Sequence, residues 1–106
     1  MEFLNKVELK GVVGRTIIQS YGSNVVLGFS VVTEYLDTDI VGNQFAETMW
    51  WSCTKIYTEV NPNIPIDKGD KAHVIGRLRQ RKYTDQSGNE KILYDVVVEK
   101  VEKIED

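Results

Sequence analysis

Short β-type stretches, each ended by turn residues, recur along this chain and restrict its fold more than any other feature. Apolar and polar residues alternate from Lys6 to about Gly14, and apolar or small residues fill both faces from Val25 to about Thr33. Similar stretches cover residues 48–57, 71–83 and 91–101. Several short strands separated by turn signals are typical of a β-sandwich or β-barrel. The sequence therefore predicts an all-β fold with five strands.

The segments between these stretches carry turn-forming residues. Residues 21–24 and 85–89 contain Gly, Ser and Asn, and the second segment predicts a hairpin turn. Residues 34–47 are acidic, with scattered apolar positions, and predict a long loop or hairpin tip. Because Pro62 and Pro65 interrupt helical hydrogen bonding, we expect at most a short helical turn between the third and fourth strands.

The length of the chain limits its organisation. With 106 residues it can bury one hydrophobic core, so we expect a single domain over residues 1–106. No apolar run reaches membrane-spanning length, and the first residues lack the basic and apolar regions of a signal peptide. We therefore expect a cytoplasmic protein without a membrane partner.

Residues able to do chemistry are few. Cys53 is the single cysteine and His73 the single histidine, so a Cys/His metal site has too few ligands. No Ser/His/Asp set or glycine-rich phosphate loop is present. Asp37 and Asp39 could hold Mg²⁺, but solvated loop carboxylates are the simpler interpretation. We expect no metal, no cofactor and no enzymatic activity, with Cys53 buried as a small apolar residue.

Positive charge is concentrated in one segment. The net charge is −3, yet residues 71–82 carry five cations and no acid. In a strand Arg77, Arg79, Arg81 and Tyr83 point to one face, where like charges repel unless a polyanion lies across them. Cations that neutralise phosphates and rings that stack on bases are typical of a single-strand groove. The alternative is a solvated face whose arginines pair with nearby carboxylates.

The two tryptophans are adjacent in the third stretch. Trp50 and Trp51 must point to opposite faces of a strand, so both cannot lie in the core. One of them is expected at a surface, an interface or a ligand.

Five motifs, in order along the chain, resemble those of bacterial single-stranded DNA-binding proteins. They are the opening Asn5-Lys6-Val7 with Gly14-Arg15, the strand Gly28–Thr33, Thr48-Met49-Trp50, Lys68-Gly69, and the run from Gly76-Arg77-Leu78 through Arg81-Lys82-Tyr83 to Asp85 and Gly88. The likeness covers residues 5–101. It implies an OB-fold, a five-stranded Greek-key barrel that binds single-stranded DNA without sequence preference in replication, recombination and repair.

The resemblance also implies partners and roles for particular residues. The expected partners are single-stranded DNA, a homo-oligomer (a tetramer, with a dimer as the alternative), and replication or repair proteins. Trp51 corresponds to a position of subunit contact and is expected at an interface or in the core. The nucleic-acid-binding residues predicted from the motif and the strand face together are Trp50, Arg77, Arg79, Arg81, Lys82 and Tyr83.

Some positions depart from the family pattern. Ile56 replaces a frequent Phe and Ser52 a frequent Arg, so one stacking ring is expected to be missing. The acidic segment 34–47 should weaken wrapping of DNA. No flexible extension with an acidic tip follows in this sequence, which predicts a trimmed or tailless relative. The alternative function is an OB-fold module similar to the primosomal replication protein N, acting mainly through protein contacts.

Overall fold

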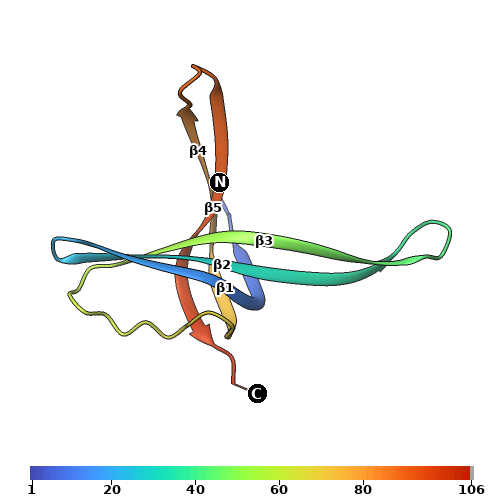
Figure 1. Ribbon diagram of the computed structural model, residues 1–106, viewed down its shortest axis with the longest axis horizontal. Helices are drawn as coiled ribbons and strands as arrows, with labels where there is room; N and C mark the ends of the chain where they lie inside the picture. The colour runs from blue at the N-terminus through green and yellow to red at the C-terminus, as the bar shows by residue number, and fades with distance from the viewer. Residues whose placement is uncertain (106) are drawn as a thin grey trace.

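The computed structural model describes residues 1–105, and five long strands account for most of them (Figure 1). The strands are β1 (Val7–Tyr21), β2 (Asn24–Thr38), β3 (Gln44–Tyr57), β4 (Lys71–Thr84) and β5 (Glu90–Lys103). Residues 1–105 contain no helix, and hence none that could cross a membrane.

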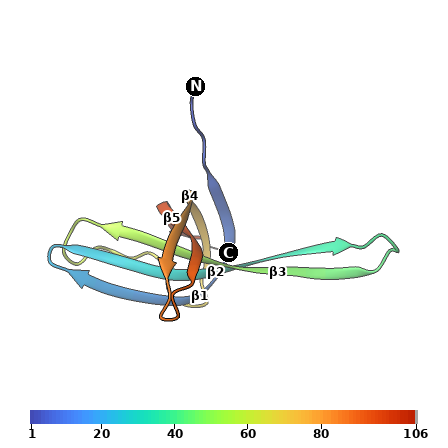
Figure 2. The same ribbon diagram turned by 90° about the horizontal axis from the view of Figure 1, so that it is seen from above.

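The strands close into a barrel in the order β1-β2-β3-β5-β4. All neighbours are antiparallel except β3 and β5, which pair in parallel at Cys53 and Thr54. In Figures 1 and 2, β1, β2 and β3 lie side by side as one long layer, and the β4–β5 hairpin crosses it. This confirms the prediction of an all-β, five-stranded OB-fold barrel.

Alternating side chains fill the barrel. Leu27, Phe29 and Val31 of β2 are buried, with exposed fractions of 0%, 5% and 0%, as their spacing predicts for one face of a strand. Cys53 of β3 is buried in the same cluster, which confirms its predicted role as a small apolar residue. Ile66, from the connection between β3 and β4, also packs into this core.

Two β-bulges bend the strands around the barrel. The register of β1 against β2 shifts between Val13 and Arg15, and that of β4 against β5 shifts between Ile75 and Gly76. A Cβ at Gly76 would overlap the Val97 carbonyl group, so only glycine allows β4 and β5 to approach this closely.

Two strand boundaries differ from the sequence-based expectations. β1 continues to Tyr21 instead of ending near Gly14. Most of residues 34–47, predicted as a long loop or hairpin tip, extends β2 and β3 as a paired two-stranded arm, and only residues 39–43 form the turn (Figure 1). The sequence did not indicate the length of this arm, because backbone pairing of two strands needs no alternation of apolar and polar residues. The connection over residues 58–70 contains no helical turn, which agrees with the expectation of at most a short one.

Candidate nucleic-acid interface

The outer face of β3 carries the first predicted site residue. Trp50 and Ser52 alternate with the buried side of the strand, and the Trp50 side chain is 60% exposed. A Cβ at Gly14 of β1 would overlap Cζ3 of Trp50 and lie 2.8 Å from its Cη2 and 3.0 Å from Oγ of Ser30. The indole therefore lies over a glycine, beside a serine hydroxyl. This leaves a flat, accessible ring on the barrel surface.

Trp51 points to the opposite face, as the parity argument predicts. Its ring is half-buried against the core, and its Nε1–H donates to Oγ1 of Thr33 over 3.0 Å. The indole also lines a hollow with Tyr35 and the start of β1. Trp51 thus has core contacts within its own chain, and its role at a subunit interface remains a prediction.

Cross-strand pairing fixes which side chains of β4 share a face. Arg77, Arg79 and Arg81 lie opposite Val97, Asp95 and Leu93 of β5, and Tyr83 lies opposite Lys91. Directly opposed residues in an antiparallel pair point to the same side of the sheet. The three arginines and Tyr83, which is 45% exposed, therefore form one row on the outer face. We call these four residues the arginine row.

Lys82 lies outside this row. It pairs with Ile92, one residue out of phase with the arginines, and so belongs to the other face of the β4–β5 hairpin. Its side chain would have to reach around the edge of the two-stranded hairpin to meet a ligand on the row. The structure therefore brings the arginines and Tyr83 together and leaves Lys82 apart.

A buried carboxylate holds part of the arginine row. Asp95 is 6% exposed and accepts hydrogen bonds from Nε and Nη2 of Arg79 over 3.0 and 2.7 Å. Its Oδ2 also accepts from the Thr54 hydroxyl over 3.1 Å and lies 3.6 Å from Nη2 of Arg81. The Arg79 guanidinium lowers the pKa of Asp95 below its ordinary value, although burial acts in the opposite direction.

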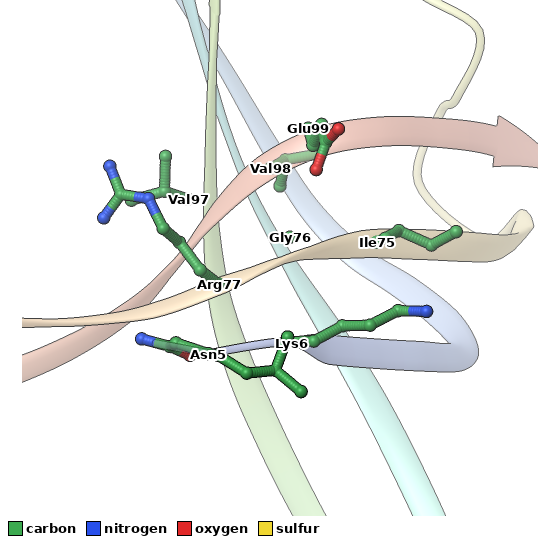
Figure 3. A pocket seen from close by; sticks show the side chains of 9 residues that line it. Asn5, Lys6, Ile75, Gly76, Arg77, Val97, Val98 and Glu99 are labelled. Carbon is green, nitrogen blue, oxygen red and sulfur yellow. The ribbon is translucent and has the colours of Figure 1, made fainter. Parts of the chain in front are cut away.

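Arg77 differs from Arg79 in its surroundings. It is exposed and borders a hollow that is also lined by Asn5 and Lys6. In Figure 3 its guanidinium rises on the side of Val97 and points away from the amine of Lys6. Glu99 lines the same hollow, but among residues 1–105 Arg77 forms no ion pair of the kind that joins Arg79 to Asp95. Its charge is therefore available to a ligand.

Asn5 has a structural role at the open edge of β4. Its Nδ2 donates to the carbonyl oxygen of Leu78 over 2.7 Å, and its Oδ1 accepts from the Leu78 amide over 3.0 Å. The β1–β4 ladder ends two residues earlier, at the pair Val7 and Gly76. The amide side chain thus extends the hydrogen bonding of the sheet under the row.

Sequence reasoning missed two charged residues on this surface. Arg15 lies opposite Ser30 and lines a groove with Ser52 and Thr54, so it adds a cation on the β1 side. Asp95 was missed as the partner of Arg79, although the register of the predicted β-hairpin places the two residues opposite each other. With Thr84 opposite Glu90, counting back along both strands places Arg79 opposite Asp95.

The site has the composition of a binding surface. Exposed indole and phenol rings can stack on flat ligands, and exposed guanidinium groups can bind phosphate or carboxylate. In the described residues, no group of three or more His, Cys, Asp or Glu side chains is arranged to hold a metal ion. The Cys53 thiol is buried, and burial raises its pKa to about 12.

A closed five-stranded barrel with cations and rings on one outer surface defines this chain as an OB-fold binding module. Sequence comparison then gives the family. The model of the Single-strand binding protein family matches residues 4–104, so the chain belongs to that family.

Related proteins and structures are similar over most of this chain. Single-stranded DNA-binding proteins of Neisseria meningitidis serogroup A and Rickettsia typhi are 31% and 33% identical over 105 and 101 residues, which is 95% and 91% of this chain. The chain spans only 60% and 66% of the length of these two relatives.

Two solved structures share the fold. A Plasmodium falciparum SSB in complex with ssDNA aligns with a TM-score of 0.78 and 23% identity, over 98% of this chain and 96% of that one. A deletion mutant of the Thermus aquaticus single-stranded DNA binding protein aligns with a TM-score of 0.78 and 20% identity, over 96% of this chain and 51% of that one.

Proposed function

We propose that residues 1–106 form one non-enzymatic domain that binds and protects single-stranded DNA, without sequence preference, during replication, recombination and repair. Membership of the Single-strand binding protein family supports this function over the alternative of a protein-contact module similar to the primosomal replication protein N. The solved SSB in complex with ssDNA, which has the same fold, adds support.

The observation that carries the proposal is the exposure of the predicted contact residues. Trp50 and Tyr83 are 60% and 45% exposed to solvent, although large aromatic rings are usually buried in a core unless they bind a partner. Arg77 and Arg81 extend from the same outer face as Tyr83. Bases would stack on the rings, and phosphates would meet the guanidinium groups.

Self-association is part of the proposal, with a tetramer as the expected form and a dimer as the alternative. The face of the β4–β5 hairpin that carries Lys82 also exposes Leu78, Ile92 and Tyr94. The radius of gyration, 16.5 Å, exceeds the roughly 13 Å typical of a compact chain of this length. Extended hairpins with uncovered apolar side chains favour association with further copies. We also propose that replication or repair proteins are further partners of this chain and that it acts in the cytoplasm.

A salt-titrated binding measurement tests the function. Quenching of tryptophan fluorescence by poly(dT) should give sub-micromolar affinity at moderate salt, and affinity should fall as salt rises because phosphate contacts release counterions. Duplex DNA of the same length should compete poorly, since its stacked bases are unavailable to the rings. Binding confined to very low salt, or equal binding to duplex DNA, would contradict the proposal.

A further inference from the structure

We propose that Asp95 is an internal counterion of the arginine row, which offsets the charge of Arg79 so that Arg77 and Arg81 supply the charge that meets phosphate. The inference rests on the proposed function, because it concerns how this surface binds a polyanion. It assigns different roles in phosphate binding to three arginines that have equivalent positions in the sequence pattern.

The geometry of the pair shows that Arg79 is held in place. Both hydrogen bonds come from neighbouring nitrogens of one guanidinium edge, Nε and Nη2, and end on the two oxygens of Asp95. This two-point arrangement is the strong form of an arginine–carboxylate interaction. The Arg79 side chain is 29% exposed and that of Asp95 only 6%, so water screens the pair less than it screens surface ions.

A second contact fixes the carboxylate itself. The Thr54 hydroxyl of β3 donates to Oδ2 of Asp95, so β3 and β4 both hold the carboxylate of β5. Asp95 is the only buried charged residue among residues 1–105. A fixed, desolvated carboxylate cannot turn away when a phosphate arrives, and it therefore competes with the phosphate for the same cations.

Arg81 is in a different position. Its closest approach to Asp95 is 3.6 Å, longer than the 2.7 Å of Arg79, and its side chain is 57% exposed. Two guanidinium groups and one carboxylate leave a net charge of +1 for this cluster. This cluster should therefore act on a bound polyanion as about one positive charge, and Arg77 should supply a second one.

Salt dependence of binding measures this charge directly. For single strands, the slope of log K against log salt changes by about 0.7 for each phosphate neutralised. Asp95→Asn should therefore steepen the slope by about 0.7, so that a fourfold rise in salt costs the variant about 2.6-fold more affinity than the wild type. The double variant Arg79→Gln/Asp95→Asn removes one charge of each sign and should keep the wild-type slope.

A control variant separates the change of charge at Asp95 from a general effect of removing an acid. Asp67→Asn makes the same change of charge in the connection between β3 and β4, and its slope should stay at the wild-type value. Thermal melting of each variant shows that binding is measured on folded protein.

The outcomes distinguish this inference from the proposed function. If the double variant binds poly(dT) with a slope lower by about 0.7, Arg79 neutralises a phosphate in full and the inference is wrong. An unchanged slope for a folded Asp95→Asn variant overturns it as well. If Asp95→Asn does not fold, the double variant alone decides. Failure of the wild-type protein to bind poly(dT) instead refutes the proposed function.

Discussion

Replacement of Gly14 by alanine tests whether the position of the Trp50 ring matters for binding. A methyl group at Gly14 would overlap Cζ3 of the indole and lie 2.8 Å from its Cη2, whereas carbon atoms prefer about 3.5–4.0 Å. The ring is 60% exposed and free to move outward, so it should shift by about 1 Å. The backbone should tolerate the change, because Gly14 is absent from the residues with positive φ.

The size of the effect follows from the stacking energy. A base stacked on an aromatic ring contributes about 1–3 kcal/mol, and a gap of 0.5–1 Å loses roughly a quarter to a half of a van der Waals contact. Gly14→Ala should therefore weaken binding of oligo(dT) by up to about 1.5 kcal/mol, or roughly 13-fold in Kd. The salt slope should not change, because no charge is altered.

Anisotropy of a labelled oligo(dT) measures the affinity, and the fluorescence maximum of the protein reports the indole environment. Gly28→Ala is the matched control: Gly28 also lies in a β-strand, and its Cβ would meet only the Ile17 carbonyl oxygen, at 3.9 Å. That variant should bind as the wild type does. If Gly14→Ala binds normally while Trp50→Ala binds weakly, or if both glycine variants lose equal affinity, the reasoning about ring position is wrong.

Three other predictions concern rings, the thiol and acid. The double variant Trp50→Ala/Tyr83→Ala should lose about 2–6 kcal/mol of poly(dT) affinity and remain folded by circular dichroism, since both rings are exposed; unchanged affinity would place the groove elsewhere. Cys53, with 1% exposure and a pKa of about 12, should react with a thiol reagent at mildly alkaline pH only after denaturation. The lowered pKa of Asp95 stabilises the fold above its ordinary value of 3.8, and this contribution is lost as pH falls through the folded-state pKa. The difference in Tm between wild type and Asp95→Asn should therefore be constant near neutral pH and shrink below about pH 4; a constant difference there would contradict it.

Strands with one buried face could be predicted from the sequence, and strands without one could not. Leu27, Phe29 and Val31 alternate because one side of β2 packs in the barrel. The second half of β1 has no such side: Ile17 and Ile18 are adjacent, and both are exposed. Period-two alternation reports burial and not backbone pairing, so the ends of β1, β2 and β3 gave no signal.

The candidate site was predictable in composition but only partly in arrangement. Parity along a strand correctly placed the three arginines and Tyr83 on one face and separated Trp50 from Trp51. The contact between Trp50 and Gly14 joins two strands that are not neighbours in the barrel order, and a bulge shifts the register between them. Parity within one strand cannot give such a contact. It depends on the curvature of the whole barrel.

The charge of the β2–β3 arm should limit how far bound single-stranded DNA extends along the protein. On the face of Trp50, the next cross-strand pair toward the arm places Glu34 opposite Thr48, and the arm over residues 34–47 contains four acids and no cation. Phosphates that pass Trp50 in this direction would meet carboxylates, which repel them. In the opposite direction Thr54 leads to Asp95 and the arginine row. Single-stranded DNA bound to this surface should therefore run from Trp50 toward the β4–β5 hairpin, and the arm should remain free of DNA.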